Sequence, residues 1–241
     1  MDAASPKTPF RQGLRDGLPI CIGYFSVSIA FGIFAVSSGL LPLEAILISA
    51  ANVTSAGQLA AVPIMLAGGS LFELAAAQFI INLRYALMSI LLSQKLDASI
   101  RLPDRLLIAF VNTDEVFAVA SAKPSVSRPY MFGLILLPFL GWTTGTAVGA
   151  FAGSVLPPLV ITALSIAIYG MFIAIVVPPA REDRHILFCV ALAVLLSCLF
   201  RYLPFLSGVQ SGFVIILCSV LAAAVTAALF PQEEKEVPDE L

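Results

Sequence analysis

The sequence predicts an all-α membrane protein, a polytopic bundle of seven to eight transmembrane helices. Hydrophobic residues make up 59% of the 241 positions, whereas charged residues make up only 12%, about half of the roughly 25% found in soluble domains. Apolar runs of about twenty residues, the length needed to cross a bilayer as a helix, recur along the whole chain. A water-soluble fold has no interior large enough for this much apolar surface.

The apolar runs can be placed in order along the chain. The candidate spans lie near residues 18–37, 43–67, 70–93, 105–121, 131–152, 156–177, 186–203 and 208–230. The connections between them are short, so residues 17–230 are expected to form a single transmembrane domain. The polar residues 1–16 are expected to be a cytoplasmic N-terminal segment, and the acidic residues 231–241 a disordered tail.

Lysine and arginine in the loops predict the orientation, because cytoplasmic loops carry an excess of them. With eight spans and a cytoplasmic N-terminus, eight basic residues lie inside and Lys95, Arg101 and Arg105 lie outside. If segment 43–67 only enters the membrane and returns, the balance becomes about seven to five. The count therefore favours eight spans with both termini inside.

Two of the candidate spans carry polar residues at their centres. Segment 43–67 contains Asn52, Ser55, Gly57 and Gln58 ahead of a proline, and the short segment 105–121 contains Asn112-Thr113-Asp114-Glu115. Irregular backbone at membrane depth is tolerated only where it is buried in protein or faces a water-filled cavity. Both helices are expected to be interrupted and to face the inside of the bundle.

Charged residues inside spans need a partner or a function, because each costs at least about 2.5–3.5 kcal/mol at the bilayer centre. Arg84 lies well inside the third span and Asp114 and Glu115 lie inside the fourth, while Glu73 lies near the start of the third. A polar stripe formed by Gln78, Asn82 and Tyr85 runs beside Arg84 on one side of the third helix.

These residues favour a site for a small solute. Arg84, or the amide groups around Gly57, is expected to hold a substrate carboxylate, and Asp114 or Glu115 to carry a proton or bind an ammonium group. The alternative is a purely structural ion pair between Arg84 and one of these carboxylates. The predicted substrate-binding residues are Asn52, Ser55, Gly57, Gln58, Asn82, Arg84 and Tyr85, and the predicted proton-coupling residues are Asp114 and Glu115.

Several other residue types point to packing rather than chemistry. Gly145, Gly149 and Gly153 have the four-residue spacing that lets helices approach closely, and Trp142 and Tyr130 are interpreted as anchors at the membrane surface. The four cysteines lie in apolar runs without a CxxC pair, and the chain has one histidine. Neither a metal site nor a cofactor is expected, and no basic patch suits nucleic acid.

The chain resembles the AzlC/YgaZ family of permeases between about residues 10 and 178. The resemblance is carried by the following segments: Gly17-Leu18-Pro19, Gly23-Tyr24, Ala30-Phe31-Gly32, Ser55-Ala56-Gly57-Gln58, Asn82-Leu83-Arg84-Tyr85, Leu87-Met88-Ser89, Thr113-Asp114-Glu115 and Phe117-Ala118. The sequence departs from the pattern at Tyr85, where a histidine is expected, and at Ser165, where an aspartate is expected.

The resemblance implies a multi-pass protein of the bacterial inner membrane that exports branched-chain amino acids. It also implies a small hydrophobic AzlD-like partner subunit, and a homo-oligomer is a further possibility. The expected function is therefore secondary export of hydrophobic amino acids driven by protons, because the chain has no phosphate-binding loop for ATP. Two alternatives are a non-transporting structural or sensor subunit and a transporter of a different small solute. An intramembrane enzyme is not expected, because no histidine base lies inside a span.

Overall fold

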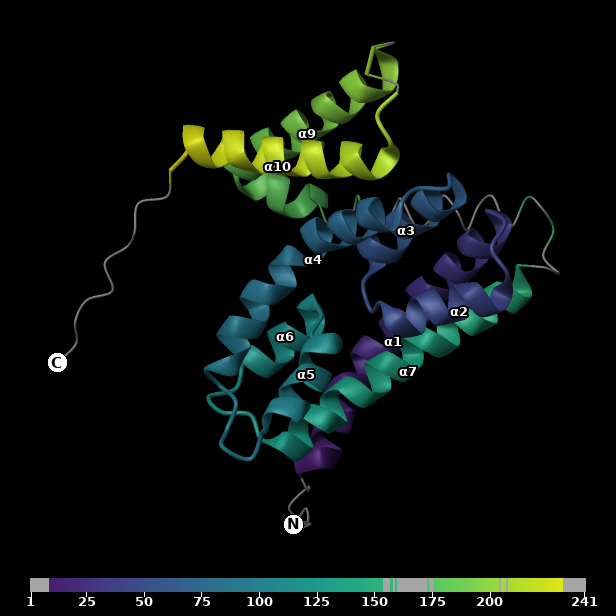
Figure 1. The fold of residues 1–241 in the computed structure, drawn as a ribbon. Helices are drawn as coiled ribbons and strands as arrows, with labels where there is room; N and C mark the ends of the chain where they lie inside the picture. The colour runs from purple at the N-terminus through teal and green to yellow at the C-terminus, as the bar shows by residue number, and fades with distance from the viewer. Residues whose placement is uncertain are drawn as a thin grey trace.

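The structure, a computed structural model, describes residues 9–153, 157, 159, 173, 176–203, 205–206 and 208–231. Within these residues the chain is helical (Figure 1), which confirms the all-α prediction. Five of the helices in the described part of the chain are long and apolar enough to cross a membrane. They are α1 (Pro9–Ser37), α4 (Leu71–Ser93), α7 (Arg128–Ala152), α9 (Arg184–Tyr202) and α10 (Ser211–Leu229). The predicted span at 156–177 lies largely outside the described residues, and the predicted total of seven to eight spans is not confirmed.

The two polar-interrupted segments are not continuous helices. Segment 43–67 forms α2 (Pro42–Ala51) and α3 (Ser55–Leu66), and segment 105–121 forms α5 (Leu102–Phe110) and α6 (Asp114–Ser121). At 1.5 Å per residue these helices are about 12–18 Å long, roughly half of the ~30 Å hydrocarbon thickness. Each pair is joined by a three-residue extended or irregular connection that contains an asparagine and a threonine.

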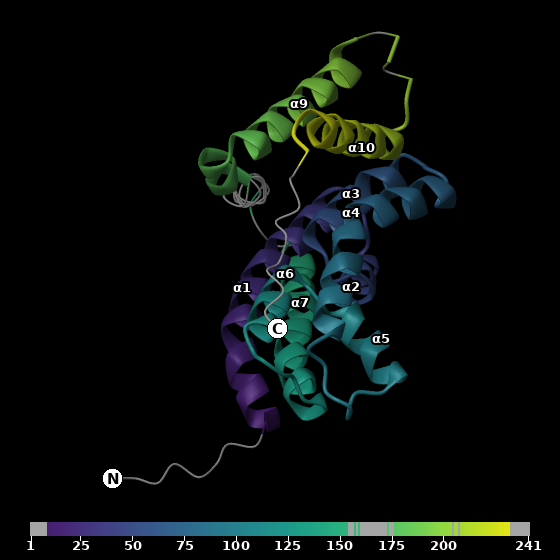
Figure 2. The ribbon, with the colours of Figure 1, turned by 90° about the vertical axis from the view of Figure 1, so that its left-hand side faces the viewer.

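Helices α1 and α7 are parallel and pack more extensively on each other than any other pair of described helices (Figures 1 and 2). A Cβ placed on Gly149 would overlap the carbonyl oxygen of Ile29, and one placed on Gly145 would overlap that of Phe25. The predicted packing role of the glycine stripe is thus confirmed for these two residues. Because only glycine leaves room for the neighbouring backbone, the sequence determines both the depth and the register of the contact.

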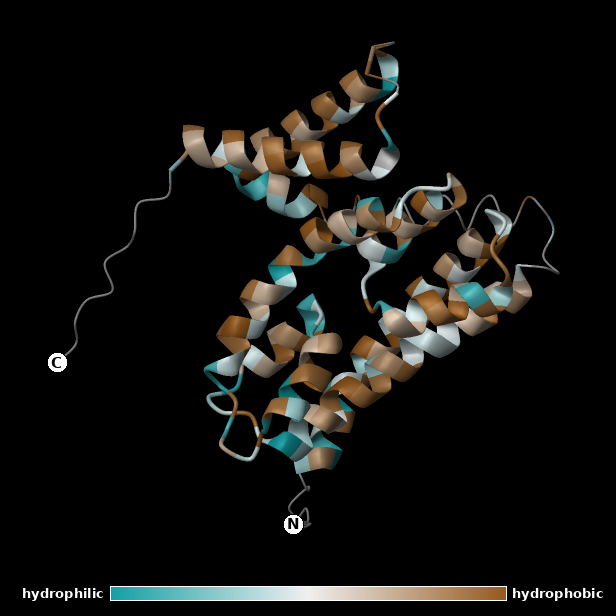
Figure 3. Ribbon diagram, in the orientation of Figure 1, coloured by the Kyte–Doolittle hydropathy of each residue, from teal (hydrophilic) through white to brown (hydrophobic). Residues whose placement is uncertain are grey.

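One end of the bundle gathers the basic residues, and we call it the basic end. Helices α1 and α7 begin here, and α4 ends here, because residues 95–97 bond to Val126 ahead of α7. Lys123 pairs with Asp16 at 3.4 Å, and Arg128 pairs with Asp104 at 2.9 Å. Polar colour is concentrated in these loops near the N-terminus (Figure 3).

The two helix pairs open toward opposite ends of the bundle. Four-residue connections, 38–41 and 67–70, join α2 and α3 to the end of α1 and the start of α4, away from the basic end. Gly68 has a φ of +70° in the second connection, which suits a residue without a side chain. Helices α5 and α6 instead begin and end at the basic end. Each pair is a hairpin whose tip points toward the middle of the bundle, and the two tips meet there.

Candidate functional site

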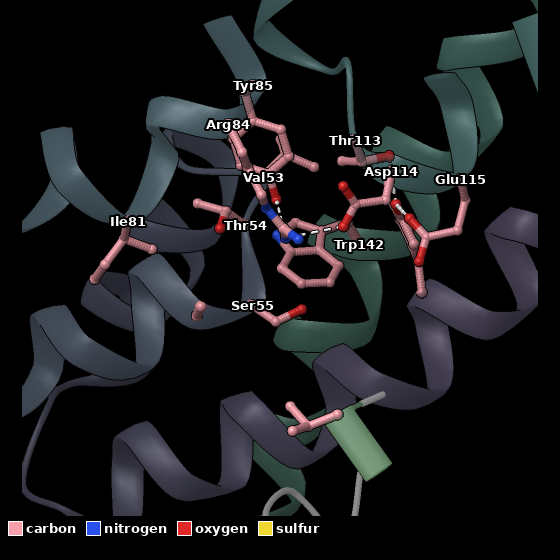
Figure 4. A pocket seen from close by; sticks show the side chains of 13 residues that line it. Val53, Thr54, Ser55, Ile81, Arg84, Tyr85, Thr113, Asp114, Glu115 and Trp142 are labelled. Atoms are coloured by element: carbon pink, nitrogen blue, oxygen red, sulfur yellow. Dashed lines mark hydrogen bonds and ion pairs between the residues drawn. The ribbon is translucent and has the colours of Figure 1, made fainter. Parts of the chain in front are cut away.

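A pocket of about 260 Å³ lies where the two hairpin tips meet the middles of α1, α4 and α7. Pockets that enclose drug-sized ligands are usually about 300–1,000 Å³, so this one suits a smaller solute. Figure 4 shows its polar side chains facing one another across the space. Its lining residues are Tyr24, Val53, Thr54, Ser55, Ala56, Ile81, Arg84, Tyr85, Thr113, Asp114, Glu115, Trp142 and Val176.

Arg84 and Asp114 form an ion pair across the pocket, with 2.8 Å between Nη2 and Oδ2 (Figure 4). Their side chains are 56% and 46% exposed, so both ends of the pair remain accessible from the pocket. Arg84 also donates to the Tyr85 hydroxyl at 3.3 Å and lies over that ring at 5.0 Å. The sequence left open whether Asp114 or Glu115 pairs with Arg84, and in the structure the partner is Asp114.

Glu115 also lines the pocket, and its carboxylate accepts from the Tyr24 hydroxyl. The Tyr24 hydroxyl contacts the carboxylate of Glu115 and also the hydroxyl of Thr113. The Tyr24 ring meets Trp142 edge-on, with 5.3 Å between centroids. The tyrosine therefore connects α1, the tip of the α5–α6 hairpin and α7 within the wall of the pocket.

The prediction made from the sequence for Trp142 was wrong. The residue was interpreted as an anchor at the membrane surface, but it lies in the middle of α7, is 2% exposed and lines the pocket. Its indole Nε1 is buried without a hydrogen-bond partner. Tyr130 does lie at the basic end, where its hydroxyl donates to Asp16 at 2.8 Å.

The second helix of each hairpin begins at the pocket. Thr54 is the N-cap of α3 and accepts from the Gly57 amide at 3.4 Å, and Thr113 is the N-cap of α6. The first amide groups of a helix have no partner within it, and the helix dipole makes this end favourable for anions. Ser55 and Ala56 at the start of α3 line the pocket directly. The pocket thus combines an arginine, two carboxylates and two helix N-termini.

The polar stripe on α4 holds the α2–α3 tip in place. Gln78 donates to the Gly57 carbonyl at 2.8 Å and accepts from Asn52 and from Asn82, both at 3.2 Å. Gly57 itself is enclosed, since a Cβ there would lie 2.6 Å from Gln78 Oε1. The sequence showed the stripe but not its role as the support of a hairpin tip.

The structure therefore divides the predicted site residues into three groups. Ser55, Arg84, Tyr85, Asp114 and Glu115 line the pocket. Asn52 and Asn82, together with Tyr85, line a second cavity beside it. Gly57 and Gln58 line neither: Gly57 supports the tip, and Gln58 is buried and accepts from Ser49 at 3.2 Å. Tyr24 and Trp142 are pocket residues that sequence reasoning missed, because nothing in the pattern showed that their helix faces are inward.

Comparison with known proteins identifies the family of this chain. The model of the family described as AzlC protein matches residues 19–156, which is more than half of the chain. The chain belongs to the AzlC family. The matched residues contain both hairpins and every pocket-lining residue except Val176.

Relatives of this AzlC-family chain include proteins from bacteria and an archaeon. It is 31% identical to the inner membrane protein YgaZ of Escherichia coli, over 96% of this chain and 94% of that protein. It is 34% identical to an uncharacterized membrane protein of Archaeoglobus fulgidus, over 77% and 82% of the two chains. It is 29% identical to one from Helicobacter pylori, over 60% and 66%. No solved structure matches.

Proposed function

We propose that this membrane protein is a secondary transporter that exports hydrophobic, branched-chain amino acids across the inner membrane. The observation that carries the proposal is the pairing of Arg84 with Asp114 across a pocket at mid-depth of the bundle. An amino acid has the same two charges, a carboxylate and an ammonium group, held a short distance apart. The pocket offers a complementary group for each.

In the proposed complex the amino acid separates the ion pair. Its carboxylate accepts hydrogen bonds from Arg84 and from the amides of Ser55 and Ala56, and its ammonium group is bound by Asp114. Separating the pair leaves neither side chain without a partner, because the substrate carboxylate replaces Asp114 beside Arg84 and the substrate ammonium group replaces Arg84 beside Asp114. The aliphatic side chain lies against Val53, Ile81 and Trp142, which are among the apolar residues of the wall.

The carboxylates also provide the proposed link to protons. Glu115 accepts from the Tyr24 hydroxyl, whereas Asp114 changes its partner when substrate binds. A carboxylate inside a bundle binds a proton when no cation lies beside it, which for Asp114 is the interval after the substrate leaves and before Arg84 pairs with it again. Export is therefore expected to be coupled to the proton gradient through Asp114 or Glu115.

The proposed topology differs from the eight-span arrangement that the charge count favoured. We place the basic end in the cytoplasm, with both hairpins re-entrant: α2–α3 from the outside and α5–α6 from the inside. All basic residues between 9 and 153 except Arg84 then lie inside, namely Arg11, Arg15, Lys95, Arg101, Arg105, Lys123 and Arg128. This distribution follows the positive-inside rule better than eight spans do. The hairpins would serve as the outer and inner gates of the pocket.

An AzlD-like small hydrophobic membrane subunit is the proposed partner, and the support for it is the family resemblance. Preloaded radiolabelled valine, leucine, isoleucine and methionine should leave exporter-deficient cells faster when this chain is expressed with such a partner. The efflux should collapse when the proton gradient is removed. No change, with the protein confirmed in the membrane, would contradict export of these solutes.

A double substitution separates the transporter from the structural-subunit alternative. Arg84→Gln and Asp114→Asn each leave one charged side chain without its partner. The double variant removes both charges, so no unpaired charge remains. If the pair is structural, the double variant should regain the wild-type thermal stability and function. If the pair binds substrate, the double variant should regain stability but show no saturable amino acid binding.

A further inference from the structure

The second cavity, of about 200 Å³, lies beside the proposed substrate pocket and shares Val53, Thr54 and Tyr85 with it. Its other lining residues are Ala51, Asn52, Asn82, Ala109, Phe110 and Asn112. These come from the end of α2, the end of α5 and the middle of α4. Whereas the substrate pocket receives the N-termini of α3 and α6, this cavity receives the C-termini of α2 and α5.

Hydrogen bonds to Gln78 determine which way the amide groups of Asn52 and Asn82 are turned. The Gly57 carbonyl can only accept, so Gln78 must present its Nε2 there and its Oε1 to the other side. Asn52 and Asn82 must then present their Nδ2 groups to Gln78 Oε1. Their carbonyl oxygens are therefore turned away from Gln78, and Asn82 Oδ1 is buried without a partner.

Asn112 provides another unpartnered oxygen. It is 3% exposed, its Nδ2 donates to Ser89 Oγ at 3.1 Å, and its Oδ1 is buried without a hydrogen-bond partner. An unpaired buried carbonyl costs about 1–3 kcal/mol. Both oxygens belong to side chains that line the same cavity, so an occupant that reaches them would offset this cost.

The surrounding field favours a cation. The last carbonyl groups of a helix have no partner within it and carry the negative end of its dipole, and two helices end here. None of the described residues that line the cavity is a carboxylate, so the site differs from Ca²⁺ sites, which usually use charged ligands. Arg84 lies in the neighbouring pocket, where Asp114 offsets its charge. Neutral oxygens with two negative helix ends suit a monovalent ion.

We propose that this cavity binds a small monovalent cation, of which Na⁺ is the natural candidate in a cell. The amide oxygens of Asn82 and Asn112 are its side-chain ligands, assisted by carbonyl groups at the ends of α2 and α5. An ordered water could donate to the same two oxygens, so water is the competing occupant that the experiment must distinguish from an ion. The site does not depend on which solute the neighbouring pocket carries.

Thermal unfolding of the purified full-length chain in detergent tests the proposal. Tm is measured against NaCl, with choline chloride keeping the ionic strength constant. A bound ion stabilises the folded protein by mass action, so Tm should rise by about 3–5 °C once Na⁺ exceeds its dissociation constant about tenfold. Binding of ²²Na⁺ should saturate over the same range. An equal rise in choline chloride, or no saturable ²²Na⁺ binding, would overturn the proposal and leave water as the occupant.

Three variants separate ion binding from structural support. Asn112→Leu removes the oxygen at similar volume and should abolish the response of Tm to Na⁺. Asn112→Asp keeps an oxygen, adds a negative charge and should preserve or tighten ²²Na⁺ binding. Ser89→Ala removes only the hydrogen bond to Asn112 Nδ2 and serves as the matched control, so it should keep the response. Loss of the response in all three variants, with each still folded, would contradict the assignment, because it would mean that amide support rather than the oxygen matters.

Discussion

Gly57 and Gly23 are two glycines for which the surroundings predict opposite effects of an added methyl group. A Cβ on Gly57 would lie 2.6 Å from both Gln78 Oε1 and Thr54 Cγ2, whereas nothing lies within 4 Å of one on Gly23. Gly57→Ala should displace Gln78 and destabilise the protein by about 1–3 kcal/mol. Gly23→Ala should be neutral or stabilising by up to about 1 kcal/mol.

Thermal unfolding of both variants and their amino acid binding would check this prediction. Gly57→Ala should lose binding, because the start of α3 moves with Gln78, while Gly23→Ala should keep it. Equal stability of the two variants would mean that the α2–α3 tip is not held as tightly as the contacts indicate.

Asp104 at the basic end predicts a dependence of stability on pH. The backbone N–H of Arg101 donates to it at 3.0 Å and Arg128 pairs with it, and these interactions hold the pKa of Asp104 below its ordinary value. A carboxyl with a lowered folded-state pKa stabilises the protein above the unfolded-state pKa, about 3.9. This contribution is lost as the pH falls further through the folded-state pKa.

Asp104→Asn should therefore lower Tm at pH 7, and the difference from wild type should shrink as the pH falls below about 4. Tm measured in detergent between pH 3 and 7 would test this. A difference that stays constant across the range would show that Asp104 acts through shape and not through its charge.

Some residues of the site could be predicted from the sequence and others could not. Arg84 and Asp114 could be found because a charge inside an apolar run is costly and stands out. Trp142 could not be placed, because an aromatic residue suits both a membrane surface and a buried wall. Its position depends on the face that α7 turns toward α1, and that face is set by glycines on both helices.

At the scale of elements, the α1–α7 contact depends on the absence of side chains. Gly149→Ala should force the helices apart, because the new methyl group overlaps the Ile29 carbonyl, and should cost about 1–3 kcal/mol. The matched control is Gly153→Ala one turn later, where the nearest atom would be 3.2 Å away. Tm in detergent, together with the amount of protein in the membrane, measures both. A loss of stability as large in Gly153→Ala would indicate a general effect of the helix and not the close approach.

The hairpins show what hydropathy can and cannot predict about elements. The polar residues at 52–58 and 112–115 correctly marked the two interrupted segments. Whether the chain crosses or returns was not visible, because an apolar half-helix has the same composition in either direction. The direction depends instead on contacts far apart in sequence, such as those of residues 95–97 with Val126.

At the scale of the whole molecule, the two hairpins have a common design with opposite orientation. Each begins with a proline in its first two positions and a carboxylate that accepts from the backbone N–H of the N-cap: Glu44 in α2 and Asp104 in α5. In each, the second helix begins at a threonine, Thr54 or Thr113. Because the hairpins enter from opposite ends, N-termini meet at one cavity and C-termini at the other. One arrangement thus creates neighbouring sites that favour opposite charges.

This arrangement predicts the side of the membrane on which each loop lies. With both hairpins re-entrant and with six full crossings, the five long helices and the predicted span at 156–177, eleven of the 13 basic residues are cytoplasmic. Only Arg84, within the bundle, and Arg201 are excepted. The eight-span arrangement instead puts Ser70 inside and Lys95 outside, so these two positions separate the alternatives.

Single cysteines provide the test, after the four native cysteines are replaced by serine or alanine. In intact cells a membrane-impermeant maleimide should label Ser70→Cys and Ser38→Cys but not Lys95→Cys or Lys123→Cys, whereas all four should react after the membrane is opened. Ser38 and Lys123 are the matched controls, because both arrangements place them on the same sides. Labelling of Lys95→Cys but not Ser70→Cys in intact cells would restore eight crossings. The hairpin tips would then be ordinary interruptions within spanning helices, and they could not act as two gates.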